Sequence, residues 1–178
     1  IRSYDATPQI FISGRILKAE NFPYLEMFVK FEFIYDTNFI LVEGCKSGET
    51  FQNAAHTNED HIAFDHPLSL NLKCRSIKGW PKLLLEAWGT DSDGRNTLLG
   101  YSVNFIPFMN GSTSLSCHTW QPSGSSFKSY FLGINPEFKD KSIVHSSEEK
   151  FPIESISNGR VIVELDIILK DFELHGIE

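Results

Sequence analysis

Two carboxylates lie close together in the stretch Asp91-Ser92-Asp93-Gly94-Arg95, which suggests a calcium site. Ca²⁺ takes about six to eight oxygen ligands, so this loop alone supplies too few. The EF-hand pattern is excluded because Gly94 comes too early and no Glu closes the loop. The segment expected to face this loop, around 19–25, adds only Glu20. The Asp-Gly pair between two apolar runs favours a simple hairpin turn.

Three histidines spaced five residues apart, His56, His61 and His66, suggest a zinc site, with Asp60 and Asp65 beside the later two. A zinc site needs ligands that converge in space, which spacing along the chain does not supply. The segment is polar, and histidines in polar loops are usually solvated. We therefore expect neither a metal nor a cofactor.

The chain contains Ser, Cys and His, the residues of nucleophilic catalysis. No G-x-S-x-G elbow and no glycine-rich phosphate loop occurs in the sequence. The three cysteines are an odd number without a CxxC pair, which favours a reduced cytosolic setting. The net charge of -7 argues against nucleic-acid binding, because that binding depends on clustered Lys and Arg. The sequence thus predicts neither an enzyme nor a nucleic-acid-binding protein.

Alternation of apolar and polar residues is the main structural signal, and a period of two predicts strands. About eight strands are expected from nine candidate segments: 9–17, 27–35, 39–43, 49–52, 68–73, 82–88, 98–105, 113–119 and 160–170. A short helix is predicted over 125–131, where three aromatic residues share one face. The segment 139–158 is polar and predicts a long loop. Strands without interleaved long helices indicate an all-β antiparallel sandwich.

Some apolar residues stand out from this pattern. Two tryptophans next to turn residues are predicted to anchor the end of a sheet: Trp80 and Trp120. Four residues interrupt otherwise polar strand faces and are candidates for binding a partner: Phe28, Ile34, Ile162 and Ile168. Packing under a loop or helix of the same chain explains these four equally well.

Several short motifs occur in the order found in one protein family. They are Gly79-Trp80-Pro81, Asp93-Gly94-Arg95, Leu99-Gly100-Tyr101, Thr119-Trp120-Gln121-Pro122 and Phe131-Leu132-Gly133. With them the chain resembles the B9-domain proteins of the ciliary transition zone, which are C2-related sandwiches of the Meckel–Gruber complex. The resemblance covers residues 10 to 178. It implies one C2-like B9 domain over 9–178, preceded by a leader over 1–8.

The resemblance also implies a function. Proteins of this family are non-enzymatic scaffolds at the base of the cilium, in the transition zone and at the basal body. They bind paralogous B9-domain proteins and support ciliogenesis and Hedgehog signalling. Gly89 stands where a C2 domain would offer an acidic residue, so any membrane contact is expected to be independent of calcium or delivered by the complex. The alternative that remains open is a peripheral C2-type phospholipid-binding module.

Overall fold

The structure is a computed structural model and describes residues 7–56, 59–120 and 159–173. Every element of that part is a strand, and every strand pair is antiparallel. The ten strands are β1 (Gln9–Glu20), β2 (Glu26–Ile34), β3 (Phe39–Gly44), β4 (Ser47–Glu49), β5 (Asn53–Ala54), β6 (His61–Cys74), β7 (Lys82–Thr90), β8 (Asn96–Phe105), β9 (Gly111–His118) and β10 (Arg160–Lys170).

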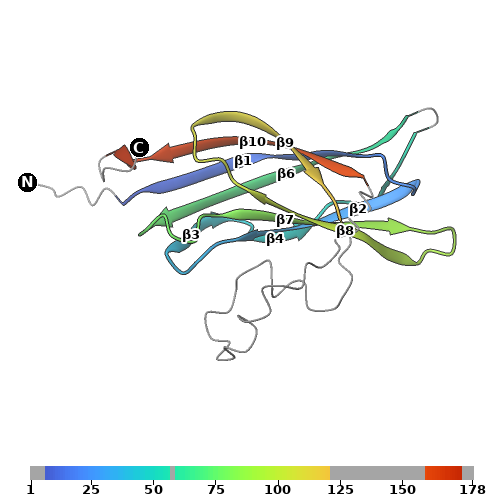
Figure 1. Ribbon diagram of the computed structural model, residues 1–178, viewed down its shortest axis with the longest axis horizontal. Coiled ribbons are helices and arrows are strands. Elements are labelled where there is room, and N and C mark those ends of the chain that lie inside the picture. The colour runs from blue at the N-terminus through green and yellow to red at the C-terminus, as the bar shows by residue number, and fades with distance from the viewer. Residues whose placement is uncertain (1–6, 57–58, 121–158, 174–178) are drawn as a thin grey trace, which may run out of the picture.

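The strands form two sheets that lie face to face (Figure 1). The first sheet has the order β3-β6-β1-β10-β9, and the second has the order β4-β2-β7-β8 with β5 beside β2. The predicted all-β antiparallel sandwich is therefore confirmed. The predicted helix over 125–131 and the predicted loop over 139–158 lie outside the described residues.

The strands differ from the predicted ones in two places. The predicted strand over 49–52 is wrong, because β4 ends at Glu49 and β5 begins at Asn53. These strands have three and two residues, too few for a period of two to show. The strand β6 begins at His61, seven residues before the alternation of 68–73. A bulge between Ile16 and Lys18 shifts its register with β1, and Asp65 has a positive φ of 47°. A bulge interrupts the alternation of faces, so the sequence pattern of the first half of β6 is lost.

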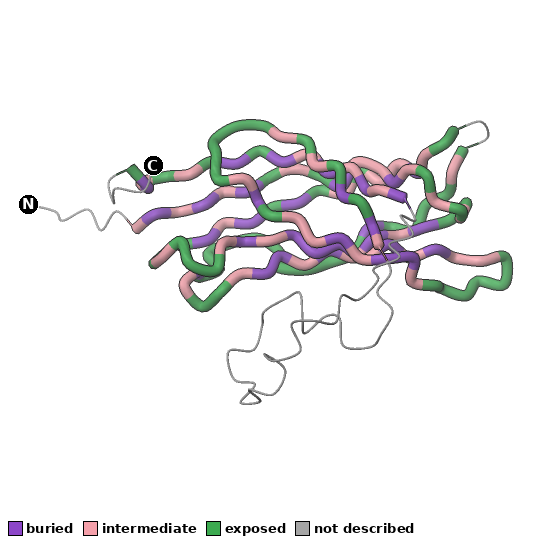
Figure 2. The backbone as a smooth tube through the Cα atoms, viewed as in Figure 1, coloured by how far each residue is buried: buried purple, intermediate pink, exposed green. Residues whose placement is uncertain are grey.

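The core lies between the sheets and consists mainly of the inward-facing residues of the long strands. Along β2 these are Met27, Val29, Phe31 and Phe33, and all four are buried. Buried and less buried residues alternate along long strands of both sheets, such as β2 and β10 (Figure 2). This alternation is what a strand with one face on a core requires.

The chain joins the two sheets at both of their edges. Between β3 and β4, the Cys45 N–H donates to the carbonyl of Ser69 in the first sheet, while the Lys46 carbonyl accepts from Phe33 in the second. At the opposite edge, the backbones of Tyr101 and Trp120 exchange two hydrogen bonds of 2.9 and 3.0 Å. The segment that follows β9 therefore pairs with β8 and ties the two sheets together.

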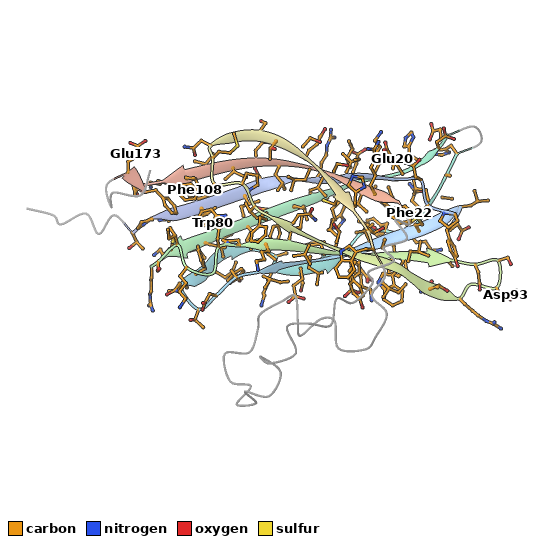
Figure 3. All side chains as sticks on the ribbon, viewed as in Figure 1. Glu20, Phe22, Trp80, Asp93, Phe108 and Glu173 are labelled. Atoms are coloured by element: carbon orange, nitrogen blue, oxygen red, sulfur yellow. The ribbon has the colours of Figure 1, made fainter. Side chains whose placement is uncertain are left out.

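The sandwich is elongated and has two distinct ends. The connections β2–β3, β6–β7 and β8–β9 lie at one end, which we call the Trp80 end (Figure 3). The connections β1–β2 and β7–β8 lie at the other, which we call the Asp93 end. The two ends and the two outer sheet faces are therefore the candidate binding surfaces.

Candidate functional site

The acidic turn at the Asp93 end is held by its own backbone. The Oδ1 atom of Asp91 accepts hydrogen bonds of 2.9 Å from the backbone N–H groups of both Asp93 and Arg95. The N–H of Gly94 donates to the carbonyl of Asp91 over 3.0 Å. The stretch is thus a hairpin turn between β7 and β8, and the carboxylate of Asp91 stabilises it.

The position at which a C2 domain offers an acidic residue is physically closed. Gly89 lies at the end of β7, and a Cβ atom added to it would lie 2.5 Å from Cγ of the Tyr24 ring. No group of three or more His, Cys, Asp or Glu side chains that could hold a metal occurs among the described residues. These residues therefore do not fit a calcium site of the C2 type.

This closure predicts the effect of restoring the acidic residue. We expect Gly89→Asp to lower the free energy of unfolding by about 2 kcal/mol, because the new side chain must displace the Tyr24 ring. Thermal unfolding with and without calcium measures this effect. A calcium-dependent rise in the melting temperature of the variant would contradict the interpretation. Gly94→Asp is the control, since it adds the same carboxylate at the same end where nothing lies within 4 Å. Its φ of 75° adds only a backbone strain of about 1 kcal/mol, without a clash.

The three histidines considered as zinc ligands, His56, His61 and His66, do not converge on one point. The ring of His66 packs against the ring of Phe31, with 5.6 Å between their centroids. Nε2 of His61 lies 3.8 Å from a carboxylate oxygen of Glu59, and His56 is exposed. The side chains thus have separate surroundings, and His66 serves as a packing residue.

All three cysteines are free thiols, and two of them are buried. Burial raises the pKa of the Cys117 thiol to about 12, and burial also raises the pKa of Cys74. Since the thiolate is the nucleophilic form, neither buried cysteine is activated for catalysis.

A hollow of about 290 Å³ lies at the Asp93 end. Its lining combines the side chains of Phe22, Tyr24 and Leu25 with Glu59 and His61. Among the described residues that line it, no Ser, Thr or Cys could act as a nucleophile beside the histidine. The hollow does not resemble a catalytic centre.

The four residues predicted to bind a partner lie on opposite sides of the sandwich. Phe28 and Ile34 belong to β2 in the second sheet, whereas Ile162 and Ile168 belong to β10 in the first. Ile168 is 60% exposed, but Ile34 is only 7% exposed and offers little surface. The structure therefore separates the set into two candidate surfaces.

The outer face of the first sheet carries several ion pairs. Arg15 lies 3.0 Å from Asp65 and 2.8 Å from Glu164. Glu20 contacts both Lys18 and Arg160, and these hydrogen bonds lower the pKa of its carboxyl group. Charged groups satisfied in this way favour contact with water over contact with an apolar partner.

The outer face of the second sheet is richer in aromatic residues. The rings of Phe28 and Trp88 stack with centroids 6.1 Å apart and planes 8° apart. The Lys30 ammonium lies 5.8 Å from the centroid of the first ring and 5.1 Å from that of the second. Phe51, beside β2 at the edge of this sheet, is 89% exposed. The periodicity predicted a strand over 49–52 but did not single out Phe51, which lies in the connection between β4 and β5.

Trp80 packs at the end of the sandwich named after it. Its ring meets those of Phe39, Phe108 and Phe172 edge-on at 5.9, 4.8 and 6.0 Å. Its Nε1–H donates a 2.7 Å hydrogen bond to the carbonyl of Ile106. Trp120, the other predicted anchor, lies at the edge where β8 pairs with the segment that follows β9.

Within the described ranges, no helix is long and apolar enough to span a membrane.

Comparison with known proteins supplies what the geometry leaves open. The chain is 32% identical to B9 domain-containing protein 2 of Xenopus laevis over 174 residues, which cover 96% of this chain and 98% of that protein. It is 27% identical to the human protein of the same name over 173 residues, with the same shares covered. B9 domain-containing protein 1 of Xenopus laevis is 25% identical over 177 residues, covering 95% of this chain and 89% of that protein.

The chain also superposes on solved structures at low sequence identity. A C2 domain of plant extended synaptotagmin 1 superposes with a TM-score of 0.43 at 10% identity, covering 90% of this chain and 93% of that one. Human GIVD cytosolic phospholipase A2 gives a TM-score of 0.49 at 12% identity, covering 92% of this chain and 17% of that one. The family model described as "B9-C2: Ciliary basal body-associated, B9 protein" matches residues 10–168. The chain therefore belongs to the B9 family of ciliary basal body-associated proteins.

Proposed function

We propose that this protein is a non-enzymatic scaffold component of the ciliary transition-zone complex. It binds paralogous B9-domain proteins in a hetero-oligomer and thereby supports ciliogenesis and Hedgehog signalling. Its place of action is the cytoplasmic base of the cilium, at the transition zone and basal body. Membership of a ciliary basal body-associated family and the existence of paralogues such as B9 domain-containing protein 1 support this proposal.

The observation that carries the proposal is the aromatic strip on the second sheet, which consists of Phe28, Phe51 and Trp88. Phe28 and Trp88 are directly paired in register on β2 and β7. Phe51 follows Thr50, whose backbone N–H donates to the carbonyl of Val29, so it lies beside the same part of β2. Aromatic residues of this kind are the usual anchors of protein–protein interfaces.

The strip is the better of the two candidate surfaces. On the first sheet, Ile162 pairs in register with Lys18, while Ile168 pairs with Phe11 and is followed two residues later by Lys170. Charged neighbours of this kind are depleted at interface cores. On the second sheet, the ammonium of Lys30 lies over the stacked rings of Phe28 and Trp88, so this charge is held against the aromatic faces.

The test is capture of a B9 domain-containing protein 1 relative from the same organism by purified variants. We expect the double variant Phe28→Glu, Phe51→Glu to weaken capture by about 30-fold or more, as expected for interface anchors. Ile168→Glu, on the opposite face and with the same type of substitution, is the matched control and should retain capture. Melting temperatures establish that each variant is folded.

The reverse outcome, in which only Ile168→Glu loses capture, would move the interface to the first sheet. Full capture by both variants would contradict the proposal that a sheet face binds the paralogue. The alternative function is a peripheral C2-type phospholipid-binding module. The closed position at Gly89 and the engaged carboxylate of Asp91 provide no support for a calcium-dependent module of this kind.

A further inference from the structure

Among the described residues, basic side chains without an acidic partner gather at the Trp80 end. The described part of the chain contains eleven Lys and Arg residues. Five of them lie within 4.0 Å of a carboxylate: Arg15, Lys18, Lys30, Lys46 and Arg160. Of the other six, five lie at the Trp80 end: Lys73, Arg75, Lys78, Lys82 and Lys170. The sixth, Arg95, lies in the turn at the opposite end.

These five residues surround the Trp80 end. Lys73 and Lys170 are both in register with Gln9, on strands that flank β1 in the first sheet. Arg75 and Lys78 lie in the connection between β6 and β7. Lys82 begins β7 in the second sheet, and its ammonium lies 5.0 Å from the centroid of the Phe105 ring. The basic groups therefore come from both sheets and from the loop between them.

Exposed apolar side chains lie at the same end as these basic residues. Ile77 lies in the β6–β7 connection, and Phe108 and Met109 lie in the β8–β9 connection. All three are exposed, Met109 to 53%. Phe108 is held in place because its ring packs edge-on against the rings of Trp80 and Phe172, at 4.8 and 5.7 Å. We call Ile77, Phe108 and Met109 the apolar tip. The Phe108 ring of this tip is held in place before it meets any partner, so its side chain loses little conformational entropy on binding.

The described residues at the two ends of the sandwich differ in charge. At the Trp80 end the five basic residues outnumber three acidic ones, Asp36, Asp171 and Glu173, which gives +2. The carboxylate of Asp36 also accepts hydrogen bonds from Thr37. Counted in the same way, with the loops and the residues within one position of a strand end, the Asp93 end has two basic residues, Arg95 and Arg160, and six acidic ones, which gives -4. The acidic residues are Glu20, Glu26, Glu59, Asp60, Asp91 and Asp93. In a chain with a net charge of -7, the described residues of the Trp80 end are therefore positive, and this end carries the apolar tip.

We propose that the Trp80 end docks on an anionic lipid surface without calcium. Apolar side chains that enter the interface, surrounded by Lys and Arg near lipid phosphates, are the combination that gives reversible membrane binding. The negative Asp93 end then points away from the membrane, because an anionic surface repels it. The aromatic strip lies on the outer face of the second sheet, so the two surfaces are separate. The inference goes beyond the scaffold function and does not depend on it.

The test is flotation of the full chain with phosphatidylcholine vesicles that contain or lack phosphatidylserine, in buffer with a calcium chelator. We expect binding to the phosphatidylserine vesicles only. The variant Lys73→Glu, Arg75→Glu, Lys78→Glu should bind about 100-fold more weakly, because each basic residue near the surface contributes to the affinity. The variant Ile77→Ser, Met109→Ser should weaken binding by about 10-fold through the loss of buried apolar area.

Arg95→Glu is the matched control, because it reverses the one described unpaired cation at the opposite end, and it should bind like the unmodified chain. Absence of binding to phosphatidylserine vesicles would overturn the proposal, and so would binding that requires calcium or that survives both sets of changes at the Trp80 end. A loss of paralogue capture by these variants without any vesicle binding would assign this end to a protein partner instead. The variant Phe28→Glu, Phe51→Glu changes only the aromatic strip and should bind vesicles like the unmodified chain. The two proposals can therefore fail separately.

Discussion

Trp80→Ala is expected to lower the free energy of unfolding by about 3 kcal/mol, the cost of removing a large aromatic side chain that packs on several others. Trp80 contacts Phe39 from β3, Phe108 from the β8–β9 connection and Phe172 after β10. Alanine would leave a cavity where these three segments meet. Denaturant unfolding followed by circular dichroism measures the change. A protein of marginal stability would lose a large fraction of its folding free energy.

Trp80→Phe separates packing from hydrogen bonding in this anchor. Phenylalanine keeps an aromatic ring in contact with its neighbours but cannot donate to the carbonyl of Ile106, which the indole reaches at 2.7 Å. We expect this variant to lose about 1 kcal/mol, the typical contribution of one hydrogen bond. If Trp80→Ala proved no worse than Trp80→Phe, the aromatic packing at this end would not stabilise the fold.

Gly14→Ala is expected to be the other strongly destabilising change, with a loss of more than about 3 kcal/mol. Gly14 lies in β1, the central strand of the first sheet, between Leu165 of β10 and Leu68 of β6. A Cβ atom there would lie 2.0 Å from the carbonyl oxygen of Glu164 and 2.9 Å from Cα of Leu165. Both are backbone atoms of a paired strand, so they cannot move aside without breaking the pairing of β1 with β10.

Gly111→Ala is the control for this prediction. Gly111 begins β9 with a positive φ of 113°, and nothing lies within 4 Å of the position that its Cβ would take. The substitution therefore has only the cost of backbone strain, about 1 kcal/mol. Unfolding of both variants in denaturant gives the comparison. Equal losses for the two would show that the close approach of Glu164 to Gly14 is unimportant for stability.

Periodicity identified most of the long strands, because each of them has one face on the core. The clearest case is 160–170, where Val161, Val163, Leu165 and Ile167 are all buried. Periodicity failed in three places for physical reasons. The strands β4 and β5 are too short, the bulge in β6 shifts the alternation, and Phe51 lies in the connection between β4 and β5, where no strand defines a face.

The candidate surfaces were less predictable than the fold. Apolar residues on polar faces were visible at Phe28 and Ile168, but the sequence could not tell that these two lie on opposite sides of the molecule. It also could not tell that Ile34 is 7% exposed, because its burial depends on neighbours from other strands. The set of unpaired basic residues is likewise invisible in the sequence, where Lys73 and Lys170 are far apart.

The sequence by itself determined the fold class, because alternation of apolar and polar residues is a local property that a strand either has or lacks. Its motifs also carried the family, and the absence of a catalytic pattern argued against an enzyme. Only the tertiary structure decided which side chains share a surface. Ion pairing between strands neutralises Arg15 and Arg160, while Lys73, Arg75 and Lys78 meet no carboxylate among the described residues. Contacts between residues distant in the chain create such differences, and these contacts depend on strand order and register.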